Sequence, residues 1–128
     1  MKQLGRHLLA ELTECDPALL DAPEALADLL REAVRLSGAT LVSEVSHRYS
    51  PYGVSLVVLI AESHFSLHTW PEYGYAAADF FTCGTAVDPV RACDFLGQAL
   101  GAQVHVREVP RGIPAGRHEL LPHKGTTP

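Results

Sequence analysis

Two turn signals constrain the fold of this chain more than any other feature of the sequence. The tetrapeptides Ser50-Pro51-Tyr52-Gly53 and Pro71-Glu72-Tyr73-Gly74 combine proline, which presets a turn dihedral, with glycine, which tolerates positive φ. Each lies between segments rich in β-branched and aromatic residues, so each predicts an antiparallel hairpin. We expect strands over the ranges 6–12, 40–49, 53–61, 65–69, 75–82 and 103–109.

Two other segments have the apolar spacing of helices. We predict that Asp21 caps the first helix with Glu24 as its capping-box partner, and that Gly38 ends it. The second helix begins after Asp88 and ends at Gly101. The apolar stripes are Leu26, Leu29, Leu30, Ala33 and Val34, and then Ala92, Phe95, Leu96, Ala99 and Leu100. These elements predict an α/β (α+β) fold: a two-layer sandwich of a mainly antiparallel sheet with two helices on one face.

Length, charge and cysteine content narrow the class of protein. A chain of 128 residues predicts a single domain over 1–128. The formal net charge of −5 argues against a nucleic-acid partner, which needs a basic surface. No segment has the composition of a signal peptide or of a membrane span, so we expect a cytoplasmic protein that does not enter membranes. The three cysteines have wide, unequal spacing and predict free thiols.

A possible acyl-transfer site follows the third predicted strand. Ser63 offers a hydroxyl nucleophile after the acidic Glu62, His68 offers an acid or base, and Cys83 offers a thiol for proton transfer. If the second hairpin turns near Glu72 and Tyr73, the numbers of opposing residues add up to 145 or 146. Cys83 is then expected opposite Glu62 or Ser63.

The spacing of Ser63 and His68 is odd, and this has a structural consequence. Residues an odd number apart on a regular strand point to opposite faces of the sheet. We therefore expect a bend or bulge between them, or an approach to His68 through the end of the chain that processing creates.

Other chemistries are weaker candidates. His64, His68 and Cys83 could imitate a zinc site, but no second close ligand pair supports it, and we expect no metal. A cysteine hydrolase using Cys83, His68 and Asp79 is conceivable. The only lysines are near the termini, which disfavours a pyridoxal phosphate enzyme.

One long motif carries a family resemblance. The segment ESHFSLHTWPEYGYAAADFFTCG, together with GRHLLAELTECD, SGAT, HRYSPYGVS and VHVREVPRG in this order, resembles the small bacterial and archaeal S-adenosylmethionine decarboxylase proenzymes. The resemblance covers nearly the whole chain. It implies that the chain cuts itself into 1–62 and 63–128 and converts Ser63 into a covalent pyruvoyl cofactor. The implied activity is decarboxylation of S-adenosylmethionine for spermidine biosynthesis.

The resemblance also implies roles for individual residues. His68 takes a proton during processing, and Ser55 helps to hold the oxyester intermediate. Cys83 returns a proton to the substrate carbon after carbon dioxide leaves. Glu72 is implied to bind the ribose hydroxyls, and Tyr49 to stack on the adenine. A single small sandwich exposes an apolar sheet face, so we expect a homodimer of cleaved protomers, and the resemblance implies sites near the protomer boundary.

Leu56 departs from the family pattern, because relatives usually read GVSG where this chain reads GVSL. A leucine in place of that glycine would reshape a pocket beside the strand, so Leu56 is a candidate substrate-binding residue. Because of this leucine, a second class of substrate stays possible: a basic amino acid such as ornithine or arginine, decarboxylated with the same pyruvoyl chemistry. A non-catalytic regulatory paralogue is a third class, which the intact Ser63, His68 and Cys83 disfavour.

Overall fold

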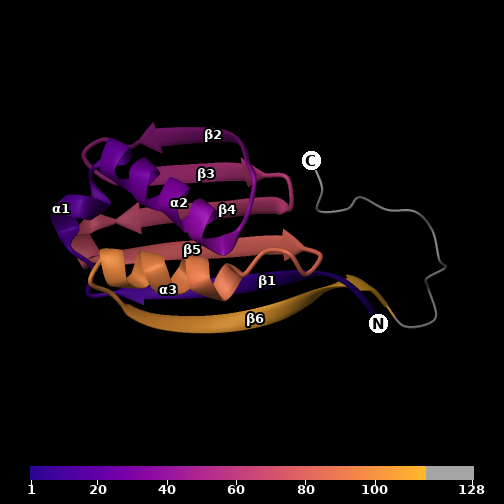
Figure 1. Ribbon diagram of the computed structural model, residues 1–128. Coiled ribbons are helices and arrows are strands. Elements are labelled where there is room, and N and C mark those ends of the chain that lie inside the picture. The colour runs from indigo at the N-terminus through magenta and orange to yellow at the C-terminus, as the bar shows by residue number, and fades with distance from the viewer. Residues whose placement is uncertain (115–128) are drawn as a thin grey trace.

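The computed structural model describes residues 1–114 as one six-stranded antiparallel sheet with helices on one face (Figure 1). The sheet order is β2-β3-β4-β5-β1-β6, so the N-terminal strand lies between β5 and the C-terminal strand. The strands are β1 (Lys2–Thr13), β2 (Leu41–Arg48), β3 (Val54–Ile60), β4 (Ser63–Trp70), β5 (Tyr75–Cys83) and β6 (Gln103–Ile113). The helices are α1 (Pro17–Leu20), α2 (Pro23–Ser37) and α3 (Pro89–Ala99), and a 3-10 turn, η1 (Pro71–Tyr73), joins β4 to β5. The predicted fold class is confirmed.

The core lies between the sheet and the two long helices. Figure 1 shows α2 and α3 crossing the same face of the sheet. Every second residue of the central strands points toward them and is buried, whereas the residues between face the open side. The buried strand residues include Leu8, Ala10 and Leu12 of β1, Val54, Leu56 and Val58 of β3, Phe65 and Leu67 of β4, and Ala78 and Phe80 of β5. This alternation leaves the polar open face available for chemistry.

The helix ends agree with the sequence in part. Gly38 ends α2 in the left-handed conformation with φ 81°, as predicted. The Asp88 carboxylate caps α3 by accepting hydrogen bonds from the main-chain N–H groups of Val90 and Arg91 at 3.1 and 3.2 Å. Both predicted termini are therefore confirmed by direct contacts.

The predicted cap of the first helix is wrong. α2 starts at Pro23 with Ala22 as its N-cap, and no side chain caps it. The Asp21 carboxylate instead accepts hydrogen bonds from Gly53 N–H at 2.9 Å and from Arg48 at 2.7 Å, which ties the short helix α1 to the β2–β3 turn. The Gly53 N–H and then the Arg48 guanidinium lower the pKa of Asp21.

In the part of the chain that the structure describes, no helix combines the length and apolar content needed to cross a lipid bilayer.

Candidate active site

The β4–β5 hairpin places Cys83 directly beside the bond before Ser63. Ser63 opposes Thr82 in the ladder, so the partner numbers add up to 145 as predicted. One step further, the main-chain N–H of Cys83 donates a hydrogen bond of 2.9 Å to the carbonyl oxygen of Glu62. The prediction that Cys83 lies opposite Glu62 or Ser63 is confirmed.

Ser63 itself has an unusual backbone conformation. Its φ is 143°, in a region that glycine favours, and the residue is buried. Such a conformation costs on the order of 1–3 kcal/mol and persists only when its surroundings hold it. The ladders that β4 makes with β3 and β5 run from Ser63 onward without a shift in register, so no bulge lies between Ser63 and His68. The other expected explanation, an approach to His68 through the end that processing creates, stays a prediction. The departure from regular geometry lies at Ser63, where the strand begins.

His68 lies at the other end of β4, in a cavity of about 350 Å³. Its Nδ1 is 2.8 Å from the Ser55 hydroxyl, and the Tyr49 hydroxyl lies 3.1 Å from the same Ser55 oxygen. The cavity is lined by Tyr49, Tyr52, Ser55, His68, Thr69, Trp70 and Glu72. The structure thus brings together four predicted site residues, Tyr49, Ser55, His68 and Glu72. The volume of the cavity suits a small ligand.

The predicted site is divided between the two ends of one strand. Five residues at a rise of about 3.4 Å each separate Ser63 from His68 by about 17 Å along β4. Glu62, Ser63 and Cys83 form one group, which we call the cleavage half, and the cavity around His68 is the pocket half. Within one chain, neither the hydrolase triad nor the metal set that pairs His68 with Cys83 is assembled.

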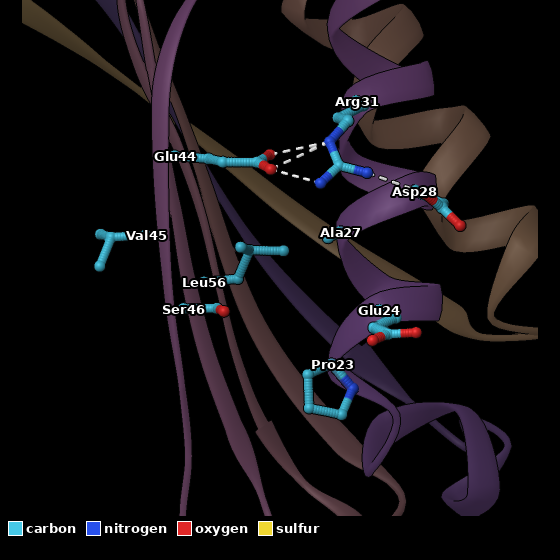
Figure 2. Close-up of a pocket in the computed structure, with 9 residues that line it drawn as sticks. All are labelled: Pro23, Glu24, Ala27, Asp28, Arg31, Glu44, Val45, Ser46 and Leu56. Atoms are coloured by element: carbon cyan, nitrogen blue, oxygen red, sulfur yellow. Dashed lines mark hydrogen bonds and ion pairs between the residues drawn. The ribbon is translucent and has the colours of Figure 1, made fainter.

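Leu56 lies on the other side of the sheet from the pocket half. Its side chain is only 1% exposed and points toward α2, because it alternates with Ser55 along β3. It borders a separate cavity of about 470 Å³ between α2 and β2, where Arg31 bridges Asp28 and Glu44 (Figure 2). The structure therefore does not place Leu56 with the other predicted substrate-binding residues.

Sequence reasoning missed a polar cluster on the open face. Asp79 on β5 lies 2.9 Å from His7 Nε2 and 3.5 Å from His64 Nε2, and it also accepts a hydrogen bond from Ser66. Burial alone would raise the pKa of Asp79, but the bonds from His64, Ser66 and His7 together hold it well below its usual range. No motif signals the cluster, since its members come from three strands, β1, β4 and β5, that meet only in the folded sheet.

The ligand atoms of His7, His64 and Asp79 lie within 4.8 Å of one another, close enough to share a metal ion. Arg111, however, lies 3.0 Å from His7 Nδ1 and can only donate there. His7 therefore carries its proton on Nε2, the nitrogen that faces Asp79. A histidine bound to metal through Nε2 needs its proton on Nδ1 instead, so this arrangement favours a hydrogen-bonded network.

Comparison with known proteins agrees with this geometry. The family model described as S-adenosylmethionine decarboxylase matches residues 6–112. A protein of Thermotoga petrophila named S-adenosylmethionine decarboxylase proenzyme is 53% identical over 98% of this chain and 99% of its own length. A proenzyme of the same name from Thermotoga maritima is also 53% identical, over 97% of this chain and 98% of its own.

A solved structure extends the similarity to three dimensions. The crystal structure of the adenosylmethionine decarboxylase from Aquifex aeolicus superposes with a TM-score of 0.83 at 36% identity, covering 93% of this chain and 99% of that one. The family model, the full-length relatives and the solved structure all point to the same family. The chain belongs to the S-adenosylmethionine decarboxylase family.

Proposed function

We propose that this protein is a self-processing, pyruvoyl-dependent S-adenosylmethionine decarboxylase that supplies decarboxylated S-adenosylmethionine for spermidine biosynthesis. The observation that carries the proposal is the hydrogen bond of 2.9 Å from Cys83 N–H to the Glu62 carbonyl, next to the strained Ser63. The names of full-length relatives support the same reaction and describe proenzymes. The site residues fit a cofactor that the chain makes from its own serine.

The cleavage half has the groups that an N-to-O acyl shift needs. The Ser63 hydroxyl attacks the Glu62 carbonyl carbon, the amide C–N bond breaks, and the hydroxyl proton passes to the amine. The positive φ of Ser63 already distorts the ground state. The Cys83 N–H is aimed at the oxygen on which negative charge develops, as a donor in an oxyanion hole is.

Elimination completes the cleavage. Loss of the Ser63 α-proton breaks the new ester and leaves a free carboxylate at Glu62 and dehydroalanine at position 63. Tautomerisation and hydrolysis by one water then release ammonia and leave a pyruvoyl group at the start of the 63–128 fragment. The end of that fragment lies outside the residues that the structure describes.

A pyruvoyl group made from Ser63 would supply a carbonyl that can condense with the substrate amine and accept the electrons released with carbon dioxide. Ser55 and His68 are already joined by a hydrogen bond of 2.8 Å and can pass a proton between them. We assign to them proton transfer and support of the ester during processing. The Cys83 thiol returns a proton to the substrate carbon.

S-Adenosylmethionine is the substrate that the pocket half favours. Tyr49, Tyr52 and Trp70 give the cavity aromatic walls on which an adenine can stack, and the Glu72 carboxylate can accept hydrogen bonds from ribose hydroxyls. The guanidinium of arginine could also stack on these walls, but neither ornithine nor arginine has ribose hydroxyls for Glu72. Leu56 does not line this cavity and is buried on the other side of the sheet. The leucine at this position therefore gives no support to ornithine or arginine as the substrate.

The separation of the two halves supports a homodimer. A proton transfer between His68 and Ser63 needs heavy atoms within about 3.2 Å, far less than the distance of about 17 Å along one strand. A two-fold axis would place the pocket half of each protomer against the cleavage half of its partner and so form two equal sites. The exposed side chains of Val45 and Leu59 on the open face offer apolar area for such an interface.

One assay tests the function. Carbon dioxide release is measured from S-adenosylmethionine, ornithine and arginine in parallel, with the Ser63→Ala variant as the control. We expect release from S-adenosylmethionine only, and none from the variant. If carbon dioxide is released from ornithine or arginine and not from S-adenosylmethionine, the proposed substrate is wrong. Equal release by wild type and Ser63→Ala would exclude a cofactor made from Ser63.

A further inference from the structure

The Glu62 side chain is a buried carboxylate whose position needs an explanation. The residue is only 3% exposed, and burying a charged carboxylate is costly unless hydrogen bonds compensate. Thr40 provides them: its N–H donates to Glu62 Oε1 at 3.0 Å and its hydroxyl lies 3.4 Å from Oε2. A buried charge is thus held by a residue distant in sequence.

Thr40 also holds the main chain one residue earlier. Its carbonyl oxygen accepts a hydrogen bond of 2.9 Å from Ala61 N–H, and on the other side the Glu62 carbonyl accepts the bond from Cys83 N–H. The segment just before Ser63 is therefore fixed both through the Glu62 side chain and through main-chain contacts on either side. We call the contacts between Thr40 and residues 61–62 the Thr40 clamp.

Thr40 is itself well placed to act as a fixed support. It follows Gly38, which ends α2, and the N–H of Ala39 donates to the Val34 carbonyl at 3.1 Å. The clamp therefore connects the C-terminal end of α2 to the start of β4. Through Thr40, the helix that covers the core is thus connected to the two residues just before Ser63.

We propose that Thr40 is a positioning residue for self-cleavage, acting through the Glu62 carboxylate to hold the Glu62–Ser63 peptide in its reactive conformation. The inference rests on the self-cleavage proposed above. When the Thr40 contacts are present, the Glu62 carbonyl keeps its hydrogen bond from Cys83 N–H and Ser63 keeps its positive φ. The Ser63 hydroxyl can then add to the Glu62 carbonyl carbon. Without it, the peptide can relax to an ordinary extended conformation, which removes the strain and misaligns the carbonyl.

The test measures the rate of cleavage in fresh, uncleaved proenzyme made by cell-free synthesis, followed by denaturing mass spectrometry. Glu62→Ala removes the carboxylate and should slow cleavage by about 10- to 100-fold, the loss of hydrogen bonds to a charged group. Glu62→Gln keeps an acceptor for the Thr40 N–H and should lose less. Thr40→Val removes only the hydroxyl and should slow cleavage by a few-fold, whereas Thr40→Ser should recover the wild-type rate.

A second readout separates positioning from a general loss of structure. Hydroxylamine attacks esters far faster than ordinary amides, so it cuts any chain that has completed the acyl shift. Because the clamp acts on that shift, hydroxylamine should not restore cleavage in Glu62→Ala. Glu108→Ala, which removes an exposed carboxylate paired with Arg6, is the matched control and should cleave like wild type.

The outcomes distinguish the two proposals. Wild type that never cleaves would overturn self-cleavage itself. Wild type that cleaves, with folded Glu62→Ala cleaving equally fast, would overturn the clamp and leave self-cleavage standing. Hydroxylamine restoring Glu62→Ala would also overturn the clamp, since the acyl shift would then be intact. If circular dichroism shows that Glu62→Ala does not fold, Glu62→Gln and Thr40→Val decide, and wild-type cleavage rates in both variants overturn the clamp.

Discussion

The main-chain N–H of Cys83 donates a hydrogen bond of 2.9 Å to the carbonyl oxygen of Glu62. The same residue therefore offers two separate groups to the proposed chemistry, a main-chain donor for cleavage and a side-chain thiol for turnover. The donor belongs to the backbone, so side-chain substitution leaves it in place. This separation makes the two steps open to independent tests.

Cleavage is the first prediction. Purified wild type should give two pieces by denaturing mass spectrometry, residues 1–62 and a 63–128 piece that begins with a pyruvoyl group. Ser63→Ala has no hydroxyl to attack the Glu62 carbonyl and should stay intact. An intact wild-type mass after long incubation would contradict both the cofactor and the mechanism.

The second prediction concerns the thiol. Cys83→Ala keeps the N–H that contacts the Glu62 carbonyl, so it should still be cleaved at a substantial rate. It should lose most decarboxylation, because no other side chain is assigned to protonate the substrate carbon. Mass spectrometry of the pieces and carbon dioxide release measure the two steps, and full activity of the variant would remove Cys83 from the mechanism.

A third prediction tests whether two protomers share a site. His68→Ala and Ser63→Ala proenzymes should each be cleaved slowly or not at all when made alone. Produced together, the heterodimer pairs the intact Ser63 of one chain with the intact His68 of the other, so the His68→Ala chain alone should be cut. Mass spectrometry identifies which chain is cut. Failure of every mixture to gain cleavage, with heterodimers shown to form, would place both residues in a single protomer.

Leu56 gives a fourth prediction. The side chain is 1% exposed and packs under α2, so Leu56→Gly should lower the free energy of unfolding by about 2–5 kcal/mol. The pocket half is on the other face, so the KM for S-adenosylmethionine should change little. Urea unfolding and steady-state kinetics check the two parts, and Val106→Gly, at a half-exposed position on the edge strand β6, is the control for glycine in a strand.

The fifth prediction concerns acid stability. The folded-state pKa of Asp79 is depressed, so its contribution to stability is complete above its unfolded pKa of about 3.9 and is lost as the pH falls toward the folded value. Asp79→Asn should therefore cost about 1–2 kcal/mol at pH 7 and lose less stability than wild type below about pH 4. Urea unfolding across pH checks this. Asp28→Asn, an exposed carboxylate, is the control, and a wild-type-like pH dependence in Asp79→Asn would show that the cluster does not stabilise the fold.

Local signals predicted most of the fold. The turn at Pro71-Glu72-Tyr73-Gly74 limits the β4–β5 register to two neighbouring pairings, and the structure has the one in which partner numbers add up to 145. The contact between Cys83 and Glu62 is a direct consequence of that register. The same reasoning failed for Asp21, because its carboxylate bonds Gly53, and local spacing cannot show a competing partner that is distant in the chain.

What the sequence by itself determined is the six strands, the two long helices, the hairpin register and the residue types of the site, because these depend on neighbours along the chain. The tertiary structure alone decided three further relations. It separated Ser63 from His68 by the regular length of β4, placed Leu56 away from the pocket half, and gathered His7, His64 and Asp79 from different strands. Such relations depend on the order of strands across the sheet, and the insertion of β1 between β5 and β6 arises from packing of the whole chain and not from any local signal.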